Sequence, residues 1–149
     1  MTIKKNIGRL VLFACLLLGM ACSAGIAHAT DQYEVVVHPG VSEKTISKSS
    51  LRAIFGMRLH AWPDGTAIQV FVMPDDAASH AAFSKEKLNV FPYQLRSAWD
   101  RLVFSGTGQA PNTVGTAEEM LAKVAATPGA IGYLNKSRTD GRVNVLQIK

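Results

Sequence analysis

The chain has 149 residues, with 16 Lys or Arg, 11 Asp or Glu and a formal net charge of +5 at pH 7. No run of basic residues of the kind that binds nucleic acid lies beyond residue 29, so we expect no nucleic-acid partner. Both cysteines, Cys15 and Cys22, lie in the first 29 residues. An apolar core, and not disulfide bonds, must therefore stabilise the fold of residues 30–149.

The first 29 residues have the pattern of a secretory signal peptide, with a basic segment at 1–9, an apolar run at 10–20 and a small-x-small sequence at 27–29. We expect export to the periplasm with cleavage after Ala29. A membrane anchor would need about 18 to 20 unbroken apolar residues, and glycine, serine and cysteine interrupt this segment. Lipidation of Cys22 is the alternative, although the residues just before it fit such a site poorly.

The β-branched run at 33–38 predicts a first strand that is buried on both faces, as in a parallel sheet covered by helices. Ser47 is a typical N-cap for the helix that follows, and Gly56 is expected to end that helix in the left-handed conformation. The predicted buried stripe of this helix is Leu51, Ile54 and Phe55. The Trp-Pro-Asp-Gly sequence at 62–65 predicts a turn.

Residues 67–73 predict a second strand with period-two alternation. One face is expected to carry Ile68, Val70 and Val72, and the other Gln69, Phe71 and Met73. A helix is then expected from about Ala77 to Leu88, with Ala82 and Phe83 facing inward. Pro92 suits the first turn of the next helix, whose predicted apolar stripe is Leu95, Trp99, Leu102 and Val103. Residues 104–111 are expected to form a loop.

The sequence Thr116–Glu119 is a capping box that predicts a helix with Met120, Leu121 and Val124 buried, ending at Pro128-Gly129. Small residues at 130–134 predict a strand against which helices pack closely. A turn at 139–141 then leads to a last strand at 143–148. This alternation predicts one α/β domain at 30–149, with a mixed or mainly parallel sheet.

The sequence contains no pattern that favours an enzyme. His38, His60 and His80 lack the short spacings of metal ligands, so no metal or cofactor is expected. A Gly-x-Ser-x-Gly nucleophile motif is absent. One physical candidate for binding remains, because the strand at 67–73 leads to a helix start whose free amides attract anions. A plainly capped helix start is the alternative interpretation of these residues.

Two segments about 70 residues apart, 51–65 and 127–133, together resemble the second lobe of the phosphate-binding proteins that feed ABC transporters. In that family a helix ending in Ile-Phe-x-Gly precedes a tryptophan turn, and this chain has Ile54-Phe55-Gly56 and Trp62. The Pro-Gly-Ala-Ile-Gly-Tyr element is complete at 128–133. The resemblance spans about 33–148 and implies a single three-layer lobe of a periplasmic binding protein.

The resemblance also implies a ligand site, although the phosphate-clamping arginine of the family falls here at Met73. The family serine, glycine and threonine fall at Ala77, Ala78 and Ser79, while the acid at Asp75 is kept. The candidate residues for a phosphate or other small-oxyanion site are Asp75, Asp76, Ala77, Ala78, Ser79 and His80, with Ser105, Gly106, Thr107 and Gly108 lining the same edge.

These observations lead to two hypotheses of different classes. The first is an exported, non-enzymatic solute-binding-protein-like module that binds phosphate or another small oxyanion. The second is a periplasmic interaction or signalling protein that keeps the fold but has lost the ligand. In that case its exposed half-cleft would dock a membrane receptor, a transporter or a second copy of the chain.

Overall fold

A six-stranded mixed sheet runs through residues 32–149, the part of the chain that the computed structural model describes. The predicted signal peptide and Cys22 lie outside these residues. The strands are β1 (Tyr33–Val37), β2 (Thr45–Ile46), β3 (Gln69–Val72), β4 (Asn112–Thr113), β5 (Ala130–Asn135) and β6 (Asn144–Ile148). Their order in the sheet is β2-β6-β1-β5-β3-β4.

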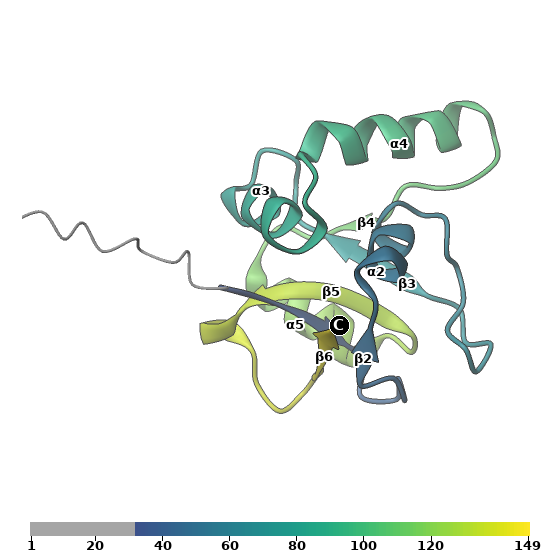
Figure 1. Cartoon of the computed structure of the whole chain (residues 1–149). Coiled ribbons are helices and arrows are strands. Elements are labelled where there is room, and N and C mark those ends of the chain that lie inside the picture. Colours follow the sequence, from purple (N-terminus) through teal and green to yellow (C-terminus); the bar gives the residue numbers. More distant parts are fainter. Residues whose placement is uncertain (1–31) are drawn as a thin grey trace, which may run out of the picture. The chain divides into compact units, whose positions relative to one another are not determined.

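Helices cover both faces of this sheet (Figure 1). They are α2 (Lys48–Phe55), α3 (Ala78–Phe83), the π-helical η1 (Ser84–Leu88), α4 (Pro92–Phe104), α5 (Ala117–Ala126) and the 3-10 turn η2 (Lys136–Arg138). Gly132 of β5 faces Met120 of α5, whereas the ring of Tyr133 contacts Phe55 and Phe83 of α2 and α3. Neighbouring residues of a strand point to opposite faces, so α5 lies on one face and α2 and α3 lie on the other. Within 32–149 no helix is both long and apolar enough to cross a bilayer.

The direction of β1 differs from the prediction. Val35, Val36 and Val37 are buried as expected, but β1 pairs antiparallel with both β5 and β6. The parallel pairings are β3 with β4 and β5, and β2 with β6. An apolar run indicates that both faces of a strand are buried, but it does not indicate the direction of the neighbouring strands. A central strand between two helical layers is buried on both faces in either case.

The predicted helix caps form. Ser47 Oγ accepts a hydrogen bond from Ser50 N at 3.0 Å, and Thr116 Oγ1 accepts one from Glu119 N at 3.1 Å. The predicted stripes Leu51, Ile54, Phe55 and Met120, Leu121, Val124 are buried. The expectation for Gly56 was wrong, because its φ is −79° and Met57 adopts the left-handed conformation at φ 57°. The Gly56 amide still donates to Arg52 O at 2.8 Å. The left-handed residue that ends the helix is therefore Met57, one residue later than predicted.

Two further expectations were wrong in detail. The predicted helix 77–88 widens into a π-helix after Phe83, and His80 and Ser84 are buried in place of Ala82. Phe71 and Met73, on the second face of the predicted strand, are buried as well as Val70 and Val72, because helices cover both faces of the sheet. Val103 of α4 is 48% exposed, since only the first two turns of the stripe, through Leu95 and Trp99, reach the core.

The two segments that carried the family resemblance meet in space. Trp62 Nε1 donates a buried hydrogen bond of 3.0 Å to the carbonyl oxygen of Gly129. Gln69 N donates to the same oxygen at 3.2 Å, which joins the start of β3 to the turn before β5. Phe83 stacks on Tyr133 with ring centroids 3.9 Å apart. The resemblance therefore corresponds to one continuous part of the core.

Candidate functional site

A cavity of about 370 Å³ lies at the carboxyl ends of the parallel strands β3 and β5. The first residues of α3 and α5 also reach it, as does η2, which follows β5. In α/β sheets this edge is the usual place for a ligand, because strand ends and helix starts meet there. The lining residues are Tyr33, Met73, Ala77, Ser79, Gly115, Thr116, Ala117, Tyr133, Leu134, Asn135, Ser137 and Arg138.

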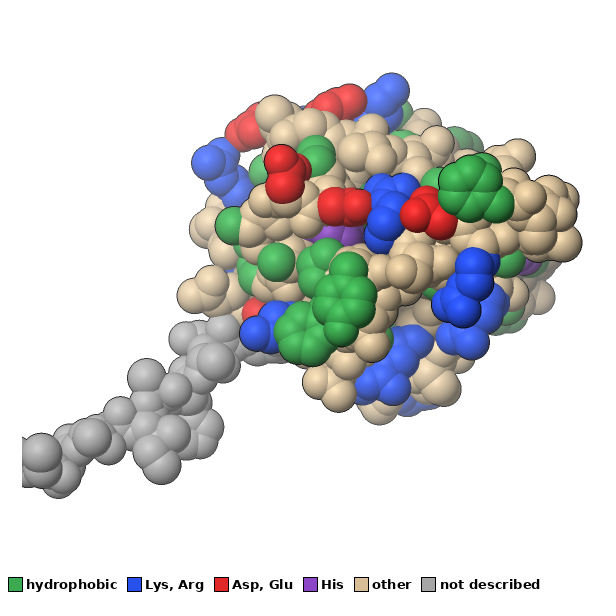
Figure 2. Space-filling view, turned by 90° about the horizontal axis from the view of Figure 1, so that it is seen from above, with side chains coloured by type: hydrophobic (Ala, Val, Ile, Leu, Met, Phe, Trp, Pro, Cys, Tyr) green, Lys and Arg blue, Asp and Glu red, His purple; other side chains and the backbone are tan. Residues whose placement is uncertain are grey.

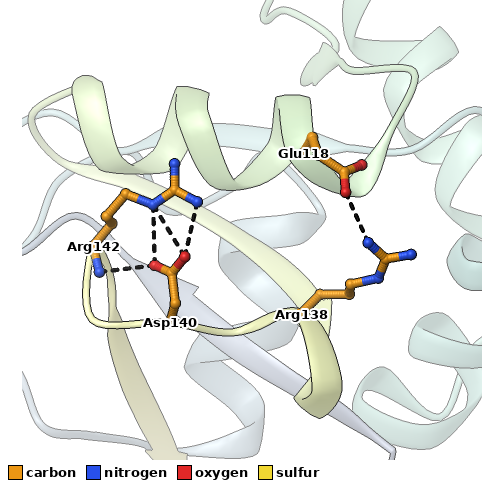
Figure 3. Close-up of polar contacts among 4 residues, drawn as sticks. All are labelled: Glu118, Arg138, Asp140 and Arg142. Carbon is orange, nitrogen blue, oxygen red and sulfur yellow. Dashed lines mark hydrogen bonds and ion pairs between the residues drawn. The ribbon is translucent and has the colours of Figure 1, made fainter.

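Arg138 is the cationic side chain of this lining. Its Nη1 lies 2.8 Å from Glu118 Oε1 at the start of α5 (Figure 3). The two side chains are 59% and 73% exposed, respectively. An ion pair this exposed contributes little free energy, so breaking it costs the protein little. The Arg138 guanidinium is therefore available to an anionic ligand in the cavity.

The two helix starts at the cavity differ in how their amides are satisfied. At α5, Thr116 Oγ1 accepts from Glu119 N, and Glu119 Oε2 accepts from Gly115 N at 2.8 Å. At α3, the N-cap residue is Ala77, which has no side-chain acceptor. The Ser79 hydroxyl makes no hydrogen bond within residues 32–149, and both Ala77 and Ser79 line the cavity. The start of α3 thus offers donors that the protein itself does not use.

The Tyr133 hydroxyl is fixed in the floor of the cavity by two buried partners. It accepts a hydrogen bond from Met73 N at 2.8 Å, and it lies 2.7 Å from His80 Nδ1. Burial raises the pKa of the Tyr133 phenol, so the hydroxyl keeps its proton in the folded state. The arrangement ties the end of β3 and helix α3 to β5.

His80 is fully buried and faces the core rather than a ligand. Its Nδ1 shares a hydrogen bond with the Tyr133 hydroxyl, and the tautomer of the ring decides which of the two donates. Within the described residues, His80 Nε2 and Ser84 Oγ have no hydrogen-bond partner. Burial lowers the pKa of His80, and the nearby Asp75 carboxylate only partly opposes this shift. A charged imidazolium is therefore disfavoured in the folded state.

The fold is expected to lose stability as the pH falls from 6.5 toward 5. The pKa of His80 lies below its ordinary value of 6.5 in the folded state, so the unfolded chain takes up the proton first. Stability that is present above pH 6.5 is therefore lost below it, by at most about 1.4 kcal/mol per pH unit. Urea unfolding of the wild type and of His80→Asn at pH 7, 6 and 5 measures the effect. An equal slope in both proteins would assign it to other groups.

Asp75 is engaged with α4 instead of the cavity. Arg96 donates to both of its carboxylate oxygens, at 2.6 Å from Nε and 3.0 Å from Nη2. These hydrogen bonds hold the pKa of Asp75 below its ordinary value. Arg96 Nη1 also lies 3.8 Å from Asp100, and Figure 2 shows acidic and basic side chains meeting on the face above α4. The acid at Asp75 thus neutralises an arginine and does not repel an anion in the cavity.

The structure brings together only part of the predicted site. Ala77 and Ser79 line the cavity, whereas Asp75, Asp76, Ala78 and His80 do not. The loop residues Ser105, Gly106, Thr107 and Gly108 do not line it either, because they follow the end of α4 that lies away from α3 (Figure 1). The expectation that this loop shares the edge with Ser79 does not hold.

Sequence reasoning missed Arg138, Asn135 and Thr116 as lining residues. The segment 135–138 directly follows the Ala-Ile-Gly-Tyr strand, and β5 runs parallel to β3. Once that pairing is known, residues after β5 must emerge at the same edge as residues after β3. The signal was therefore the polar sequence Asn-Lys-Ser-Arg at the end of a buried strand.

The fold is similar to part of the fold of several phosphate-binding proteins of ABC transporters. An ABC-type phosphate transport receptor from Vibrio cholerae superposes with a TM-score of 0.62 at 13% sequence identity, and covers 78% of this chain. PstS from Borrelia burgdorferi superposes with a TM-score of 0.60 at 16% sequence identity and covers 79% of this chain. A third structure, from Clostridium perfringens, is described as a phosphate ABC transporter substrate-binding protein with bound phosphate. It superposes with a TM-score of 0.64 at 15% sequence identity and covers 78% of this chain.

The aligned part is 46%, 47% and 44% of those three chains, respectively, so this chain spans less than half the length of its structural neighbours. That share is consistent with one lobe of such a protein. The sequence matches no protein-family model and no curated protein. At these identities the likeness establishes the α/β fold and does not transfer the ligand.

Proposed function

We propose that this chain is an exported, non-enzymatic module of the periplasmic-binding-protein type that binds phosphate or a similar small oxyanion at the cavity lined by Ser79 and Arg138. The observation that carries the proposal is an exposed guanidinium beside unused donors at the carboxyl ends of two parallel strands. Anions are held in such places by charge-assisted hydrogen bonds. The fold neighbours support the same ligand class.

Arg138 replaces a function that the family resemblance assigns to the position of Met73. Met73 is buried, and its amide donates to Tyr133, so this position offers an anion no guanidinium. Arg138 reaches the cavity from η2, which directly follows β5. Because its side chain is mostly exposed, we expect modest affinity that falls with ionic strength.

Phosphate is expected to raise the unfolding temperature of the purified protein by several degrees. At a concentration 100-fold above Kd, a ligand that binds only the folded state adds about 2.7 kcal/mol of stability. Thermal unfolding with phosphate, sulfate and acetate at constant ionic strength measures the shift. Arg138→Gln is expected to weaken phosphate binding roughly tenfold or more, because it removes a charge-assisted hydrogen bond.

Arg142→Gln is the matched control, since it removes the same charge from a nearby loop. Arg142 pairs with Asp140, at 2.8 Å from Nη2 to Oδ2, away from Glu118 and Arg138 (Figure 3). Its phosphate response is expected to equal that of the wild type. A second variant, Ser79→Ala, tests the start of α3. Equal responses in the Arg138 and Arg142 variants would show that the anion binds elsewhere.

The second candidate is a periplasmic interaction module that docks a membrane receptor, a transporter or another copy. It is favoured by Met73 and Ala77 at the positions of the family's arginine and serine, where neither side chain hydrogen-bonds an anion. Stacked aromatic rings at Phe91 and Tyr93 are also exposed. No stabilisation by any oxyanion would favour this candidate, and capture of a defined envelope partner would support it.

A further inference from the structure

A second cavity, of about 410 Å³, lies between the end of α2, the residues that follow η1, and α4. Its lining is largely apolar and includes Leu88, Val90, Leu95 and Leu102. Three arginines, Arg52, Arg58 and Arg101, line the same cavity, and no acidic residue does. We refer to it as the arginine groove. It shares no lining residue with the phosphate cavity proposed above.

The three guanidinium groups have no carboxylate partner among residues 32–149. Arg52 Nε donates to Leu88 O at 2.6 Å, which holds this side chain across the groove. Arg101 Nε donates to Ser97 O at 3.2 Å. The terminal Nη nitrogens of all three make no hydrogen bond within the described part of the chain. Most of their donor capacity is unused.

These arginines are also not needed to cap the helices that end nearby. At α2 the carbonyl oxygens of Arg52, Ala53 and Ile54 already accept from the amides of 56–59 at 2.8 to 3.1 Å. At α4 the carbonyl oxygens of Arg101, Leu102 and Val103 accept from the amides of 105–108. Basic side chains near a helix end are often explained by such capping. Here the backbone satisfies the carbonyls without them.

The arginine groove therefore places three positive charges beside an apolar floor, and no acidic residue of its lining neutralises them. Figure 2 shows Lys and Arg side chains gathered on one side of the face above α4 without acidic ones among them. Placing three guanidinium groups around one cavity costs electrostatic free energy unless an anion is bound. An apolar floor in turn favours a ligand with an apolar body.

We propose that the arginine groove binds a small amphiphilic carboxylate, with its carboxylate on Arg58 and Arg101 and its apolar body against Leu95 and Leu102. The volume lies within the range of about 300 to 1,000 Å³ that small ligands occupy. A stable protein partner would need a larger contact, with a total buried area above about 1,000 Å². Carboxylate and guanidinium form paired, charge-assisted hydrogen bonds.

Titration calorimetry with octanoate tests this proposal on the purified protein. The expected result is saturable binding of octanoate, with acetate and octan-1-ol each binding at least about tenfold more weakly, since one lacks the apolar body and the other the charge. Arg58→Gln combined with Arg101→Gln is expected to weaken octanoate binding by a similar factor. Arg52 is left in place, because its hydrogen bond to Leu88 supports the fold.

Lys123→Gln is the control, because Lys123 is exposed on α5, on the opposite face of the sheet. It is expected to bind octanoate as the wild type does. Circular dichroism confirms that the double variant is folded before titration. Octanoate binding that survives in the folded double variant overturns the proposal. Equal binding of octanoate and octan-1-ol, or no saturable binding at millimolar octanoate, also overturns it.

Discussion

Gly129→Ala is expected to lower the free energy of unfolding by about 3 kcal/mol. Gly129 has a φ of 74°, and a Cβ placed there would collide with the backbone oxygen of Ala67. Left-handed geometry costs a non-glycine residue about 1 to 2 kcal/mol, and forced overpacking adds about 1 to 3 kcal/mol. The Gly129 carbonyl also accepts from Trp62 and Gln69, so a shift of this turn disturbs both bonds.

Gly65→Ala separates the two contributions. Gly65 also has a positive φ, of 88°, but a Cβ there would meet no atom within 4 Å. This variant should lose only the conformational part, about 1 kcal/mol. Guanidinium unfolding of the two variants and the wild type measures the difference. If both alanine variants lost the same stability, close approach of Ala67 would not be what requires glycine at position 129.

Tyr133→Phe is expected to cost about 3 kcal/mol, although it keeps the ring that stacks on Phe83. The change removes only the hydroxyl, and it leaves the amide of Met73 and Nδ1 of His80 without their hydrogen-bond partner. Each buried polar group left unsatisfied costs about 1 to 3 kcal/mol. The loss should appear in the unfolding midpoint, with the denaturant slope unchanged.

Tyr93→Phe is the control for this change, because Tyr93 lies on the surface and is 67% exposed. Its stability should equal that of the wild type. The double variant of Tyr133→Phe and His80→Asn tests the coupling between the two side chains, since partners in one network are not additive. Additive losses would show that the hydroxyl and the imidazole act independently of each other.

Most of the local structure could be predicted because it depends on residues close in the sequence. Ser47 and Thr116 bond amides three residues away, so their capping is independent of the rest of the fold. The small residues predicted for β5 have a direct explanation at Gly132. A Cβ there would lie 2.5 Å from Met120 Sδ of α5. The two-residue strands β2 and β4 escaped prediction because so short a segment has no periodicity to detect.

The candidate site was only half predictable. The start of α3 could be inferred because Ala77 and Ser79 directly follow β3 along the chain. Arg138 could not be inferred in the same way, because it lies about 60 residues further on and reaches the cavity through strand pairing. His80 illustrates the opposite case. Its position next to Ser79 at the start of α3 suggested a contact with the ligand, but its ring is buried in the core.

By itself the sequence determined most of the helices, the N-caps Ser47 and Thr116, the Trp62 and Gly129 turns and the α/β class, since these follow from short-range hydrogen bonds and from apolar periodicity. Only the tertiary structure decided the antiparallel direction of β1, the membership of the edge cavity and the convergence of three arginines on one groove. The physical reason is that the type of a residue indicates whether it is buried. The direction of a strand and the meeting of side chains from distant segments depend instead on which strand or helix becomes the neighbour.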